Sequence, residues 1–299
     1  MRTQANAARK VWKGIRSGGL SLVAATALSA CSMSGGGEVM PLPPVASGPV
    51  ATYADLATYA DAAQFAIVAT VDSTSTLSPE RAPGVAPGMA RLYVEAQTDA
   101  LLAGQVPIGE EIAYLVDVPL TAEGKVPKIR NSQVILFARS ADQATGQAGA
   151  FQLVAPDAQL PATAENLSRV RAIFAELYAA DAPPRITGIR DGLSVAGNLA
   201  GESETQLFLQ SANRQPVTVT VLRRPNAAPA WGVSWSEIVD QTASAPAPNT
   251  IGWYRLACSL PAALPANALL TGSAADRQRA AADYAFVLSS LGPCERNRT

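Results

Sequence analysis

The 299-residue chain contains no histidine and only three cysteines. Histidine is the commonest general base and metal ligand, so its absence excludes Ser-His-Asp and Cys-His sites and most zinc sites. Beyond residue 31 the only lysines are Lys125 and Lys128, and neither has the S-x-x-K spacing of a Ser-Lys hydrolase. Phosphate-binding, dinucleotide-binding and calcium-binding loop motifs are also missing. We therefore expect no metal, no cofactor and no enzymatic activity.

Positive charge is scarce after the N-terminal region. The first thirty residues hold no acid and five bases, which are Arg2, Arg9, Lys10, Lys13 and Arg16. The other 18 bases stand against 24 acids, which gives residues 31–299 a net charge of −6. A body of this charge has no electrostatic basis for binding nucleic acid, so we expect no such partner.

The N-terminal region lacks an apolar run long enough to cross a bilayer, which needs about 20 residues. Its most apolar part, Leu20–Ala30, has eleven residues and follows the basic stretch Met1–Arg16, as in a secretory signal peptide. The run ends in Leu28-Ser29-Ala30-Cys31. This tetrapeptide resembles the lipobox of bacterial lipoproteins. The alternatives are an ordinary secretory signal with a chance cysteine, or an uncleaved N-terminal anchor.

The lipobox resemblance implies that residues 1–30 are a signal peptide and that Cys31 carries membrane lipid. Acyl chains such as palmitate would hold the protein at the membrane, because two or three chains anchor durably whereas one is marginal. Ser32, in place of the Asp that retains many lipoproteins at the inner membrane, favours the outer membrane of a Gram-negative bacterium. Residues 31–51, rich in Gly and Pro, predict a flexible tether.

The two other cysteines, Cys258 and Cys294, form an even pair. In the oxidising envelope or periplasm such a pair predicts a disulfide. A catalytic thiol is the competing interpretation, but the chain offers no histidine partner and no C-x-x-C spacing.

Residues 52–162 show the pattern of a small β-domain. Thr52 and Asp55 form a capping-box pattern that predicts a helix, and five compact apolar segments follow. The expected strands are Phe65–Val71, Ala90–Thr98, Glu111–Val118, Gln133–Arg139 and Ala150–Val154. Their order resembles the five-stranded OB-like barrel of netrin-like domains, through Phe65–Val71, Leu101–Gly104, Val134–Ala138 and Phe151–Val154. The resemblance implies a binding or interaction module.

A second β-rich unit is expected over residues 183–299, after a bridging helix over residues 163–182. Its predicted strands are Gln206–Gln210, Val217–Val221, Trp231–Val239 and Ile251–Ala257, and a C-terminal helix follows with the apolar stripe Ala280, Tyr284, Val287, Leu288 and Leu291. The predicted fold class is therefore mostly β with a few helices (α+β): a small five-stranded barrel-like unit, a second β-rich unit and a C-terminal helix.

Three tryptophans are the most suggestive candidate ligand platform. Trp231 and Trp235 alternate on one expected strand and Trp253 lies on the next, so exposed indoles could stack on a sugar ring or hold a peptide. We favour the alternative, a hydrophobic core, because the unit has few other large side chains.

Charged pairs offer weaker signals. Glu110-Glu111 and Glu202-x-Glu204 are the only option for a carboxylate-dependent hydrolase, although acids in loops are usually just solvated. Arg190-Asp191 and Arg223-Arg224 could bind anions, but surface charges at strand ends explain them as well.

These observations favour a membrane-anchored envelope lipoprotein that acts as a non-enzymatic binding module for an envelope protein or glycan. The alternatives are a carboxylate-dependent hydrolase of envelope glycans and a structural component of the envelope.

The anchor is testable at one residue. Replacing Cys31 with Ser removes the thiol that would carry lipid, so lipid labelling should be abolished and the protein should move to the soluble fraction. Radiolabelled fatty acid and cell fractionation measure both effects, and unchanged membrane association would contradict the anchor.

Overall fold

The computed structural model describes residues 49–105, 107–236, 244–268 and 272–298. The predicted lipobox (Leu28, Ser29, Ala30 and Cys31), the predicted signal peptide and most of the predicted tether lie outside these residues. In the described part, no helix combines the length and the apolar character needed to cross a membrane. The fold class is the one predicted: the described chain is mostly β, with two sheets and five α-helices.

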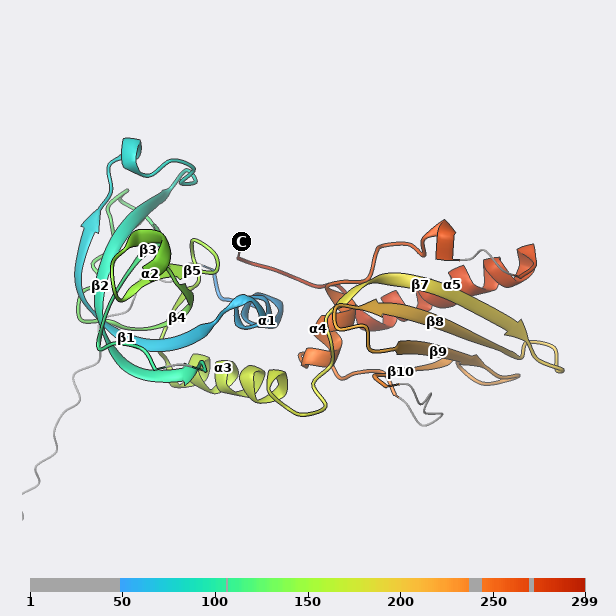
Figure 1. The fold of residues 1–299 in the computed structure, drawn as a ribbon. Helices are drawn as coiled ribbons and strands as arrows, with labels where there is room; N and C mark the ends of the chain where they lie inside the picture. The colour runs from blue at the N-terminus through green and yellow to red at the C-terminus, as the bar shows by residue number, and fades with distance from the viewer. Residues whose placement is uncertain (1–48, 106, 237–243, 269–271, 299) are drawn as a thin grey trace, which may run out of the picture. The chain divides into compact units, whose positions relative to one another are not determined.

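Six strands and three helices make up the N-terminal part of the structure (Figure 1). The strands are β1 (Phe65–Thr76), β2 (Met89–Ala103), β3 (Glu111–Pro119), β4 (Gln133–Ser140), β5 (Ala150–Leu153) and β6 (Gln159–Pro161). The helices are α1 (Tyr53–Ala62), α2 (Asp142–Thr145) and α3 (Ala164–Leu177), and a 3₁₀ turn, η1, covers Pro79–Arg81.

The first sheet closes on itself. Its order is β1-β2-β3-β5-β4-β6, and an additional pairing joins β1 to β4. β3 and β5 run parallel, whereas the other neighbours are antiparallel. Strands β1 to β5 therefore form the predicted closed five-stranded barrel, which is loosely consistent with an OB-like barrel.

Burial along these strands explains their sequence patterns. The first half of β1, Phe65–Ala69, is buried at every position, and a strand covered on both faces forms a continuous apolar run. In β2 and β3 buried and more exposed residues mostly alternate, as in half-buried strands. The Tyr114 hydroxyl donates a hydrogen bond to Gln159 Oε1 (2.7 Å), and burial raises its pKa. The buried hydroxyl thus has its partner inside the domain.

The second sheet contains β7 (Ile186–Ala196), β8 (Ser203–Ser211), β9 (Val217–Arg223) and β10 (Ala230–Ser234). Its order is β10-β9-β8-β7, with antiparallel neighbours throughout. Helix α4 (Ile251–Ala257), a 3₁₀ turn η2 (Ala266–Ala268) and helix α5 (Ala274–Leu291) follow in the chain. Figure 1 shows α5 running beside the sheet, where it contacts β7 and β8. The second β-rich unit and the C-terminal helix are therefore confirmed.

One expected strand is wrong: Ile251–Ala257 forms helix α4. The Thr250 hydroxyl caps this helix by accepting a hydrogen bond from the Trp253 amide (3.2 Å). Residues 251–256 are all buried, so the segment shows no polar alternation. A short apolar run of this kind fits a buried helix turn as well as a buried strand, and tertiary contacts decide between them.

A buried carboxylate joins α5 to the second sheet. Asp283 has no exposed surface, and it accepts hydrogen bonds from Arg223 Nε and Thr205 Oγ1, both at 2.5 Å. Because Thr205 faces α5 and side chains alternate along a strand, Phe208 and Gln210 point to the opposite face of β8. The ion pair thus lies on the face of the sheet that the helix covers, together with the buried apolar residues Leu207, Leu209 and Tyr284.

Asp283→Asn should lower the free energy of unfolding by about 2 kcal/mol, because it leaves Arg223 without its counter-charge. The expected cost is below that of a fully buried pair, since a third of the Arg223 side chain is exposed. Urea unfolding measures it. Asp181→Asn is the matched control at an exposed position and should change stability by less than about 0.5 kcal/mol. Equal stability of the two variants would contradict the role given to Asp283.

The predicted disulfide is present. Cys258 follows the last residue of α4, Cys294 lies three residues after the end of α5, and their sulfur atoms are 2.10 Å apart. The bond closes a loop with a sequence separation of 36 residues and ties the two helix ends together.

Removing this disulfide should destabilise the protein by roughly 4 kcal/mol in the chain-entropy model, because the unfolded chain gains freedom. Cys258→Ser and Cys294→Ser should each show the loss in urea unfolding under non-reducing conditions. Each should also abolish the mobility difference between reduced and non-reduced protein on gels. A mobility difference that persisted in either variant would exclude this pairing.

Candidate functional site

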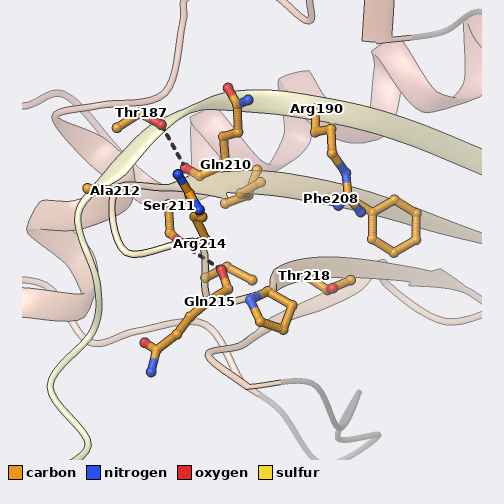
Figure 2. Close-up of a pocket in the computed structure, with 12 residues that line it drawn as sticks. Thr187, Arg190, Phe208, Gln210, Ser211, Ala212, Arg214, Gln215 and Thr218 are labelled. Carbon is orange, nitrogen blue, oxygen red and sulfur yellow. Dashed lines mark hydrogen bonds between the residues drawn. The ribbon is translucent and has the colours of Figure 1, made fainter.

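A groove of about 540 Å³ lies at the β8–β9 hairpin end of the second sheet, on the side of Phe208 and Gln210 (Figure 2). Twelve residues from β7, β8, β9 and the turn between β8 and β9 line it. The sequence predicts the two strands on either side of this turn, 206–210 and 217–221, but it does not predict β7.

Two β-bulges in β7 bring its side chains into the groove. The pairing with β8 shifts between Ile186 and Gly188 and again between Ile189 and Asp191, so Thr187 and Arg190 are the extra residues. Both extra residues line the groove. Residues three apart in a regular strand point to opposite faces, and only the bulges place this pair on one face.

Bulges also explain why the sequence pattern misses β7. Gly188 and Gly192 interrupt the segment, and Arg190-Asp191 lies in its centre, so it lacks apolar alternation. Isolated glycines within a strand are typical of bulges and close approaches. At Gly188 a Cβ would lie 3.4 Å from Gln210 Oε1, which shows how closely the carboxamide approaches this backbone.

The turn between β8 and β9 supplies the second arginine. Arg214 has a φ of 65°, a left-handed conformation that favours Gly or Asn. Hydrogen bonds hold the turn: Ser211 Oγ donates to Gln215 O (2.6 Å), and Asn213 Oδ1 accepts from the Gln215 amide (3.2 Å). Arg214 is therefore kept in a strained conformation by its neighbours.

The groove is positively charged. Within the described residues, neither Arg190 nor Arg214 forms an ion pair, and no carboxylate lines the groove. Figure 2 shows Arg190 beside Phe208, and its guanidinium carbon is 5.8 Å from the ring centroid. The nearest acid in sequence, Asp191, accepts a hydrogen bond from the Gly192 amide (2.8 Å). The site therefore presents two cations that have no acidic partner among the described residues.

Besides the two arginines, the polar residues that line the groove are all neutral: Thr187, Gln210, Ser211, Gln215 and Thr218. The Thr187 hydroxyl donates to the Gln210 carbonyl (3.3 Å), and Thr218 lies directly opposite Phe208 in the strand pairing. Hydroxyl and carboxamide side chains can both donate and accept hydrogen bonds. Such a lining suits a ligand that carries many polar groups besides its negative charge.

The three tryptophans of the candidate platform do not share a strand face. Trp253 lies in α4, is 7% exposed and donates its indole N–H to the Leu291 carbonyl (2.8 Å). Trp231 is half-buried in β10 and donates to Ser290 Oγ on α5 (2.8 Å). Trp235, also half-buried, lies against Gly252 of α4. We therefore place the candidate site at the arginine groove.

None of the acidic residues of the hydrolase alternative lines the arginine groove. Glu202 accepts a hydrogen bond from the Leu199 amide (3.3 Å), and Glu204 accepts one from Gln206 Nε2 (2.7 Å). Glu111 lines a second hollow but Glu110 does not. Arg223, one of the suggested anion-binding residues, is paired with Asp283.

This second hollow is a cleft of about 290 Å³ on the barrel, over β2 and β3 and next to the loop before β5. Asp72, Glu95 and Glu111 make its lining acidic, and Ser73 Oγ donates to Glu95 Oε2 (2.8 Å). Among the described residues, no group of three His, Cys, Asp or Glu side chains is arranged to bind a metal ion.

Comparison with known proteins gives no matching family model and no significantly similar curated protein.

Proposed function

We propose that the protein is a lipid-anchored, non-enzymatic binding module of the bacterial cell envelope, and that the arginine groove is its binding site. The observation that carries the proposal is the groove itself, with two arginines that lack acidic partners in the described structure. Cations without partners at a hollow of this kind favour binding of an anionic group. The lipobox ending at Cys31 supports the location, with lipid at that residue and the outer membrane as the proposed site of anchoring.

The barrel supports an interaction role as well. OB-like barrels bind their ligands on the face of strands 2 and 3 and on the loops that follow strands 1 and 4. The acidic cleft lies over β2 and β3 and includes Gln147 from the loop between β4 and β5. This location supports an interaction role if the barrel is used as OB-like barrels are, and kinship with netrin-like domains stays a prediction.

In-cell photocrosslinking tests the binding role. A photoreactive amino acid at Gln215, which lines the groove, should yield adducts with an envelope component in intact cells. The same residue at Gln143, an exposed position in α2, is the matched control and should yield none. No adduct from Gln215 would contradict a binding module at this site and would favour a purely structural component.

The non-enzymatic character has its own test. Replacing Glu110, Glu111, Glu202 and Glu204 with Gln should leave the crosslinking yield from Gln215 unchanged, because these carboxylates are not part of the groove. Purified protein should also release no reducing ends from envelope glycans. Glycan hydrolysis that was lost on these substitutions would establish the hydrolase instead.

A further inference from the structure

We infer that the arginine groove binds an anionic saccharide, whose carboxylate or phosphate is held by Arg190 and Arg214 while neutral side chains hold its hydroxyls. This inference rests on the proposed function and adds the chemical class of the ligand. It is carried by four observations: the charge of the groove, its neutral polar lining, the strand pairing beneath it, and the conformation of Arg214.

The charge argument begins with the guanidinium groups. An arginine presents a planar fork of donors that matches a carboxylate or a phosphate, and charge-assisted hydrogen bonds are about twice as strong as neutral ones. Arg190 is exposed in the bulge of β7 and Arg214 is exposed in the turn, so both are accessible to a ligand. Asp191 lies beside Arg190 in the chain and reduces the local positive potential.

The neutral lining favours a saccharide as the carrier of the anion. Sugar hydroxyls donate and accept hydrogen bonds, as do Thr187, Gln210 and Gln215. Phe208 and Pro216 add apolar surface against which the C–H face of a sugar ring can pack. If the groove only attracted negative charge, its neutral polar and apolar side chains would have no role in binding.

The strand pairing disfavours a peptide as the ligand. Peptides commonly bind sheets by adding a strand to an edge whose backbone groups are free. Of the three strands that line the groove, β8 and β9 are paired on both sides. The third, β7, is an edge strand, but its two bulges interrupt the regular backbone that an added strand would pair with. Recognition here must come from side chains, which suits a ligand with many polar substituents.

The conformation of Arg214 is a further feature that is typical of binding sites. Its φ of 65° would be adopted at lower cost by Gly or Asn. Strained residues cluster at binding sites, where the surrounding structure holds them in place. Arg214→Asn should therefore fold at least as stably as the parent protein while losing a ligand contact.

The binding experiment uses the full-length chain in non-ionic detergent and isothermal titration calorimetry. The first probe is a galacturonic acid pentasaccharide, and the second is a phosphorylated mannan oligosaccharide. Binding of the first assigns a carboxylate ligand, and binding of the second a phosphate ligand. The methyl-esterified pentasaccharide, which lacks the charge, should bind at least tenfold more weakly than the free acid.

Variants connect the binding to the groove. Arg190→Gln and Arg214→Asn should each weaken binding about tenfold, the value of one charge-assisted hydrogen bond. Asp191→Asn should strengthen binding about twofold to threefold, because it removes a negative charge beside Arg190. Arg224→Gln, an exposed arginine just beyond the other end of β9, is the matched control and should leave affinity unchanged. The melting temperature of Arg214→Asn should equal or exceed that of the parent.

Several outcomes would overturn the inference. These are no binding of either anionic probe, equal binding of the methyl ester, or parent affinity in both arginine variants. Equal affinity for polyglutamate would show that the groove selects charge and not a saccharide, and preferential binding to phosphatidylglycerol vesicles would assign a lipid surface. If crosslinks from Gln215 persist while the saccharides fail, the binding module stands and only the ligand class is wrong.

Discussion

The buried ion pair between Asp283 and Arg223 is the interaction on which the second sheet and its groove depend. A carboxylate without exposed surface is costly unless it is paired and hydrogen-bonded, and Arg223 and Thr205 supply both partners. This requirement holds α5 against one face of the second sheet, where the helix contacts β7 and β8. A shift of the β8 register by one residue would turn every side chain of the strand to the other face. The contact of Thr205 with Asp283 therefore also keeps Phe208 and Gln210 on the face opposite α5.

Two irregularities of the backbone then build the groove on that face. The bulges of β7 turn Thr187 and Arg190 to the same side, and the β8–β9 turn holds Arg214 in a left-handed conformation. Regular strands and a regular turn would scatter these side chains. Departures from ideal geometry in an otherwise regular sheet are typical of binding sites, because they direct side chains to positions that side chains of a regular strand cannot reach.

Local patterns predict much of the fold and little of the site. The five barrel strands, the capping box at Thr52, and the disulfide between Cys258 and Cys294 all follow from residues close in sequence or from elimination. Helix α4 and strand β7 do not. The former is a short apolar run without periodicity, and the latter contains two glycines and an Arg-Asp pair, so neither carries the signal of its own secondary structure.

The sequence alone determined the charge distribution, the lack of histidine chemistry, the barrel strands and the apolar stripe of α5, because each depends on residue type or on near neighbours in the chain. Only the tertiary structure decided that Trp253 is buried in a helix and that Arg190 and Arg214, 24 positions apart, line one groove. The physical reason is register: which side chains meet depends on bulges, turn conformation and the pairing of Asp283 with Arg223, and none of these leaves a periodic trace in the sequence.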